Sequence, residues 1–127
     1  MSAYAIVMTV TYLILGIGAV SIGLRAQQEK LPMNSWAGLK TPKLIANETA
    51  WIQGHKAAAG YIMLGGVPFI IGAILFFFVD ESYIAFISLP IVLIMLISMI
   101  ASFKKANDAA EQYKEAGDLK KSRSMMH

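Results

Sequence analysis

Three long apolar runs without a charged residue or a histidine set the limits on how this chain can fold. They are Ala3–Leu24, Ala57–Val79 and Tyr83–Phe103, and each has 21 to 23 residues. As helices they would be about 32–35 Å long, which matches the ~30 Å thickness of a bilayer core. A core helix of a soluble protein carries polar residues along one face, and these runs carry no such face. The sequence therefore predicts an all-α membrane protein with three transmembrane helices.

A signal peptide is the alternative for the first run. Signal peptides have a basic start and an apolar core of only about 7–15 residues. Here Met1-Ser2 carries no charge and the apolar run continues to Leu24, so we expect the run to remain as a span. The 127 residues then form a single membrane domain, residues 1–127, with a loop over residues 25–56 and a tail over residues 104–127.

The positive charges predict the orientation of the chain. All 11 Lys and Arg residues lie in the loop 25–56 or in the tail 104–127. The start of the chain and the short link Asp80-Glu81-Ser82 have none. By the positive-inside rule, the loop and the C-terminus are cytoplasmic and the N-terminus lies outside. The short link also makes the second and third spans antiparallel neighbours.

Small residues recur on one face of each of the first two spans. In the first span they are Gly16, Ala19 and Gly23, and in the second they are Ala58, Gly65 and Gly72. Small residues let helix backbones approach closely in a membrane. The faces serve either a homo-oligomer or the packing of the three spans within one chain, and we favour packing within the chain.

The tail is predicted to begin as a short cytoplasmic helix that continues the third span. This helix would cover Lys104–Ala116 and end at Gly117, since glycine is common just after a helix. The polar residues Asp118–His127 have no helical pattern and are expected to be poorly ordered. The basic residues of the tail are expected to contact the head groups of the lipid bilayer.

The loop is predicted to be structured at the membrane surface. Pro32, Gly38 and Pro42 favour a folded, non-helical first half, because proline fixes φ and glycine allows unusual backbone angles. Asn34 is expected to bond to the backbone of the turn, and Trp36 to lie at head-group depth. Lys43 is assigned to solvent.

A helix is predicted to start near Asn47, which is a good N-cap, and to continue into the second span. Glu48 would lie favourably at the positive end of the helix dipole. Glu48, Trp51 and His55 would share one face two turns long.

The residue types in the loop argue against catalysis. Glu48 and His55 would be about 10 Å apart along the helix axis, which is too far for joint metal ligation or for proton transfer between them. The chain has no cysteine, no H-E-x-x-H pattern and no glycine-rich phosphate loop. We therefore predict that the protein is not an enzyme, that it has no cofactor and no metal site, and that it does not bind nucleic acid.

Two spaced motifs in the loop resemble a known family. They read Asn34-x-x-x-Gly38-x-Lys40-Thr41-Pro42 and Trp51-x-x-x-His55-Lys56. This is similar to the signature of the SdpI family of bacterial integral membrane proteins, N-x-x-x-G-x-R-T-P-x-T followed by W-x-x-x-H-R at the start of a transmembrane helix. Lys40 and Lys56 stand where the family has Arg, which removes a bidentate hydrogen-bonding group, and Leu44 stands where it has Thr. The predicted motif and binding residues are Asn34, Trp36, Gly38, Lys40, Thr41, Pro42, Glu48, Trp51, His55 and Lys56.

The resemblance implies a multi-pass protein that functions in the plasma membrane of a bacterium. The family is named for immunity to a secreted, membrane-active toxin peptide, and this chain is similar to the C-terminal unit of the longer immunity members. We predict an SdpI-like, non-enzymatic membrane protein that acts by binding, in resistance to a membrane-active peptide or in membrane-linked signalling. The alternative is a small accessory subunit of a larger membrane complex. The expected partners are the lipid bilayer, a peptide toxin or such a complex.

Overall fold

The computed structural model describes residues 2–34 and 37–125, with side chains as far as residue 113. Three long helices, α1 (Ala3–Gln27), α2 (Glu48–Leu75) and α3 (Ile84–Met125), are joined through two short 3-10 helices, η1 (Leu44–Ala46) and η2 (Glu81–Tyr83). The residues in these ranges form no β-strand. All three long helices are long and apolar enough to cross a membrane. The predicted all-α, three-span fold is confirmed.

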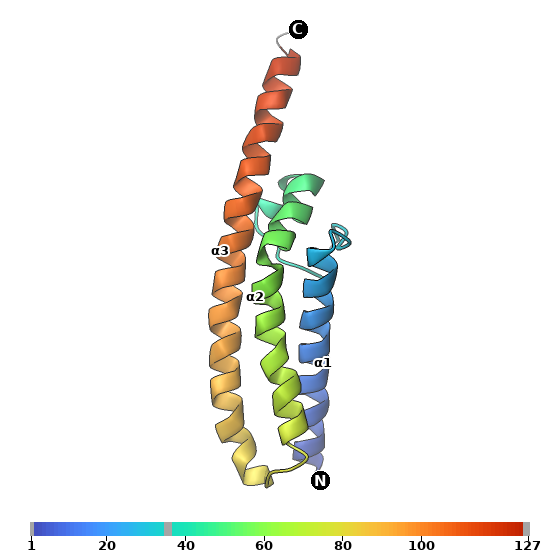
Figure 1. The fold of residues 1–127 in the computed structure, drawn as a ribbon, viewed down its shortest axis with the longest axis vertical. Coiled ribbons are helices and arrows are strands. Elements are labelled where there is room, and N and C mark those ends of the chain that lie inside the picture. The colour runs from blue at the N-terminus through green and yellow to red at the C-terminus, as the bar shows by residue number, and fades with distance from the viewer. Residues whose placement is uncertain (1, 35–36, 126–127) are drawn as a thin grey trace.

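The helices are arranged with α2 packed against both α1 and α3 (Figure 1). The N-terminus and the link between α2 and α3 lie at one end of the bundle, and the loop between α1 and α2 lies toward the other end. α3 extends beyond the other two helices at that second end. The loop and the C-terminal part of α3 are thus on the same side of the bundle. Which side of the membrane this is stays a prediction.

The helices α1 and α2 meet at two glycines that face each other. A Cβ added to Gly16 would lie 2.9 Å from the carbonyl oxygen of Gly66, and a Cβ added to Gly66 would lie 3.0 Å from the carbonyl oxygen of Gly16. Further along the same crossing, a Cβ on Gly23 would lie 3.1 Å from the carbonyl oxygen of Ala59. The small-residue face of the first span is therefore occupied by packing within the chain.

The interface of α2 with α3 also depends on small residues. Ala58 is fully buried, and a Cβ added to Gly72 would lie 2.5 Å from Ile91 of α3. Between α1 and α2, the ring of Tyr12 packs edge-on against Phe69, with ring centroids 4.9 Å apart. Glycine and alanine thus set the distance between the helices, while aromatic rings fill the space between them.

The ends of the helices differ from those of the apolar runs. α1 continues to Gln27, α2 starts at Glu48 and stops at Leu75, and α3 runs through Gly117 to Met125. The prediction that the tail helix ends at Gly117 is wrong. A glycine inside a helix costs only about 1 kcal/mol relative to alanine, and the flanking sequence is rich in Glu, Lys and Ala, which are good helix formers.

Candidate functional site

The loop between α1 and α2 folds back on the start of α2. Asn47 is the N-cap of α2, and its Oδ1 accepts a hydrogen bond from the backbone N–H of Ala50 at 2.8 Å. Glu48 is exposed in the first turn, near the positive end of the helix dipole. The predicted start of the helix at Asn47 is confirmed.

The imidazole of His55 joins the loop to α2. Its Nε2 lies 2.8 Å from the backbone nitrogen of Leu39 and accepts that N–H, so it carries no proton of its own. Its Nδ1 lies 2.7 Å from the carbonyl oxygen of Trp51 and therefore carries the ring proton. The residue is fully buried. Both ring nitrogens therefore form hydrogen bonds with backbone groups.

The indole ring of Trp51 packs against the imidazole ring of His55. The two rings have centroids 4.2 Å apart, and the indole is fully buried. Its Nε1–H donates to the carbonyl oxygen of Leu31 at 3.2 Å, which fixes the first part of the loop. Gly38 lies against both rings with φ +105°, and a Cβ there would lie 2.8 Å from His55 Nε2 and 2.9 Å from Trp51 Cζ2. The position thus needs glycine for its backbone angle and for space.

The turn that begins the motif is held by Asn34. Its side-chain nitrogen donates to the carbonyl oxygen of Pro32 at 2.7 Å, and its Oδ1 accepts the N–H of Ala37 at 2.6 Å. These are the backbone bonds expected for an asparagine in a turn. Trp36, also predicted to belong to the site, lies outside the described residues.

The next part of the loop is fastened to α3. The hydroxyl of Thr41 donates to Oδ1 of Asn107, and the Lys43 ammonium lies 3.3 Å from a carboxylate oxygen of Glu111. Asn107 and Glu111 lie one helical turn apart, so they offer two contacts on the same face of α3. Lys43, which is expected to face solvent, has a side chain that is 40% exposed and also forms this ion pair. Such a partly exposed pair contributes little to stability.

Leu44 fills the space between the loop, α2 and α3. It is fully buried in a cluster with Trp51, Ala106 and Ala110. A Cβ added to Gly54 would clash with Leu44 and would lie 2.9 Å from the carbonyl oxygen of Ala106. A leucine at this position therefore makes the contact between η1 and the two helices apolar.

A second clamp connects the end of α1 to α2. Glu29 follows the helix with φ +59°, an angle that costs a non-glycine residue about 1–2 kcal/mol. Its carboxylate accepts a hydrogen bond from the side chain of Gln53 at 2.7 Å and lies 3.3 Å from the ammonium of Lys56. The Gln53 bond first, and then Lys56, hold the pKa of the Glu29 carboxyl below its ordinary value. These contacts place Lys56 in the clamp between α1 and α2.

The structure brings together some of the predicted site residues and separates others. Gly38, Trp51 and His55 form one buried contact, whereas Lys40, Pro42 and Glu48 are exposed. Lys40 makes no hydrogen bond or ion pair within residues 2–34 and 37–113. It lies between Leu39, which is held by His55, and Thr41, which is held by Asn107. The roles of these residues in binding stay a prediction.

Several partners of the motif have no signal of their own in the sequence. The carbonyl oxygen of Leu31 and the N–H of Leu39 are backbone groups, which every residue possesses. Asn107 and Glu111 are ordinary polar residues of a helix surface. Their spacing of one turn is compatible with a shared contact, but nothing in it indicates the loop as the partner.

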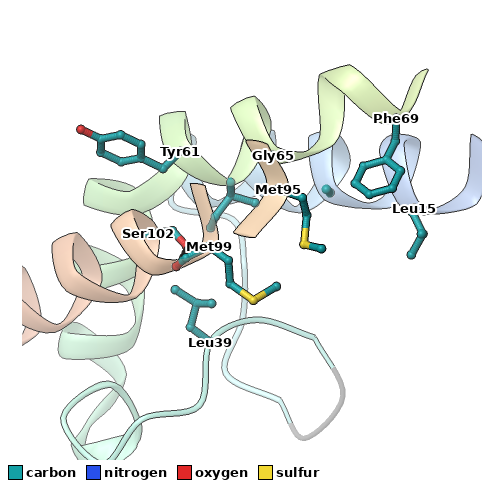
Figure 2. Close-up of a pocket in the computed structure, with 10 residues that line it drawn as sticks. Leu15, Leu39, Tyr61, Gly65, Phe69, Met95, Met99 and Ser102 are labelled. Carbon is teal, nitrogen blue, oxygen red and sulfur yellow. Dashed lines mark hydrogen bonds between the residues drawn. The ribbon is translucent and has the colours of Figure 1, made fainter. Parts of the chain in front are cut away.

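An apolar cavity lies below the loop, between α1 and α3. Its volume is about 260 Å³. Figure 2 shows Leu39 reaching from the loop toward Met99, with Met95 beside it and the ring of Tyr61 pointing away. The residues that line it include Leu15, Leu39, Phe69, Met95, Met99 and Ser102.

The chain matches one family model. The model is described as the SdpI/YfhL protein family and covers residues 30–102, which include the loop, α2 and most of the apolar part of α3. No curated protein and no solved structure matches the chain.

Proposed function

Since this chain belongs to the SdpI/YfhL protein family, we propose that it gives resistance to a membrane-active peptide by binding it without enzymatic turnover. The binding surface in this proposal is the segment Lys40–Pro42 at one end of the helix bundle, in which Lys40 and Pro42 are exposed. A protein of this kind protects the membrane by holding the peptide in a harmless state.

The observation that supports this proposal is that Lys40 has an exposed side chain on a backbone that is held on both sides. Its neighbours Leu39 and Thr41 are tied to α2 and α3, so the backbone on both sides of Lys40 is fixed. Its side chain is exposed and unpaired within the described residues with side chains. A pre-positioned cation loses little backbone entropy on binding an anionic group.

The non-enzymatic part of the proposal is supported by His55. It is the histidine of the motif, and both of its nitrogens are engaged with the backbone groups of Leu39 and Trp51. A general base needs a free nitrogen within reach of a substrate proton. In this arrangement the histidine positions the loop.

The test is a survival assay in a peptide-sensitive bacterium that expresses the chain and is exposed to a panel of secreted membrane-active peptides. Lys40→Arg should keep or strengthen protection, because Arg offers two parallel hydrogen bonds to an anionic group. Lys40→Glu should abolish protection. The control is Lys30→Glu, which makes the same charge change at another exposed lysine of the loop.

Protection that persists in Lys40→Glu at equal expression would contradict the proposed surface. A wild-type chain that protects against no peptide of the panel, and that is recovered stoichiometrically with a larger membrane complex, would replace the proposal with the accessory-subunit function. A pH-dependent turnover of the peptide by the wild type would show that the protein is an enzyme.

A further inference from the structure

We propose that the cavity between α1 and α3 holds one acyl chain of an anionic phospholipid, whose headgroup phosphate contacts Lys40. This goes beyond the proposed function, and its test contains no peptide, so that either proposal can fail without the other.

The lining fits a hydrocarbon chain and excludes polar ligands. Leu15, Phe69, Met95 and Met99 are apolar and lie within the three candidate spans. The polar side chain that faces this space is Ser102, and its hydroxyl already donates to the carbonyl oxygen of Met99 at 2.8 Å. An ordered water needs two to four polar partners, about three on average, and the cavity does not offer them.

The cavity opens toward the surface that faces the hydrocarbon of the bilayer. Leu15 is 49% exposed and Met99 is 46% exposed, although both line the cavity. A lipid chain can therefore enter from the side. Unbranched methionine side chains adapt to an irregular occupant, and Met95 and Met99 both point into this space (Figure 2).

The volume is large enough for a section of an acyl chain. About 260 Å³ exceeds the ~150 Å³ of an apolar protein cavity that takes up benzene. A section of a flexible hydrocarbon chain therefore fits inside.

The charge at the loop end of the cavity selects the headgroup. Leu39 of the loop lines this end, and the next residue is Lys40, which is exposed and unpaired within the described residues. Because the backbone of Leu39 is held by His55, the step from apolar cavity to cation occurs at a fixed place. This order, apolar chain site and then cation, complements an anionic phospholipid.

The experiment is native mass spectrometry of the full chain, purified in mild detergent and mixed with equal amounts of palmitoyl-oleoyl phosphatidylglycerol and phosphatidylcholine. Met99→Trp should fill the cavity, while its control Ile100→Trp adds the same ring on the outer face of α3, where residue 100 is 71% exposed. Lys40→Gln removes the cation, and its control Lys30→Gln removes another exposed lysine of the loop.

The wild type should retain one phosphatidylglycerol about fivefold more than phosphatidylcholine, the ratio that corresponds to about 1 kcal/mol for one lysine near an anionic lipid. Met99→Trp should lose both lipids, and Lys40→Gln should keep one lipid without preference. Both controls should behave as the wild type. Absence of a retained lipid in the wild type, equal retention in Met99→Trp, or the same loss of preference in Lys30→Gln would overturn the proposal.

Discussion

The Nε2 of His55 accepts the backbone N–H of Leu39 at 2.8 Å, across 16 positions of the chain. This bond ties the loop to the second helix at the point where the loop meets the cavity between α1 and α3. The other ring nitrogen is engaged with the carbonyl oxygen of Trp51, so the ring is neutral and held in one orientation. His55 is therefore a positioning residue for the loop.

The first prediction concerns this bond. His55→Gln keeps a side-chain oxygen near the place of Nε2, whereas His55→Asn is too short to reach the N–H of Leu39. Leaving a buried N–H without an acceptor costs about 1–3 kcal/mol. His55→Asn should therefore have a clearly lower Tm in detergent than His55→Gln. If both variants melt like the wild type, the bond does not hold the loop.

The second prediction concerns Gly38. Gly38→Ala has to adopt φ +105° and places its Cβ 2.8 Å from His55 Nε2, so we expect a loss of about 2 kcal/mol or more. The control is Gly60→Ala, where a Cβ meets nothing within 4 Å and alanine improves the helix by about 1 kcal/mol. The measurement is the Tm of both variants in the same detergent. A Gly38→Ala protein as stable as Gly60→Ala would show that the loop is an ordinary linker.

The apolar runs were enough to predict the helices, because spanning a bilayer requires length and apolarity and little else. The start of α2 at Asn47 was also predictable, since a cap is a local feature. The docking of the loop was not. It depends on backbone groups such as the N–H of Leu39 and on the ordinary surface residue Asn107, neither of which differs from many others in the sequence. The cavity between α1 and α3 exists only in the packed bundle.

The third prediction concerns the crossing of α1 and α2. Gly16→Ala would place a Cβ 2.9 Å from the carbonyl oxygen of Gly66, and a backbone atom cannot move aside as a side chain can. Forcing the helices apart should cost about 1–3 kcal/mol. Gly18→Ala, two residues away on the same helix, meets nothing within 4 Å and serves as the control. The Tm of Gly16→Ala should be lower than that of Gly18→Ala. Equal Tm values for the two variants would show that the helices α1 and α2 do not meet at Gly16.

The fourth prediction concerns the pH dependence of the clamp at Glu29. The pKa of its carboxyl is lowered from the ordinary value of 4.5, first by the bond from Gln53 and then by Lys56. The stabilisation is therefore complete above pH 4.5 and is lost as the pH falls through the lower pKa of the folded protein. Between pH 6 and pH 3, the Tm of the wild type should decrease by more than the Tm of Glu29→Gln. The control Glu81→Gln removes a carboxylate at the other end of the bundle and should follow the wild type. Identical pH profiles for Glu29→Gln and the wild type would show that the clamp does not form.

The fifth prediction concerns the orientation in the membrane. The chain has no cysteine, so single cysteines can be introduced for labelling. Cysteines at Lys30 and Ser122 should be protected from a membrane-impermeant thiol reagent in intact cells, because the basic loop and tail are expected inside. A cysteine at Ser82, in the exposed link between α2 and α3, should react. Permeabilised cells provide the control, since all three positions should then be labelled. Labelling at Lys30 together with protection at Ser82 in intact cells would reverse the orientation and would place Lys40 and the loop end of the cavity on the outer side of the membrane.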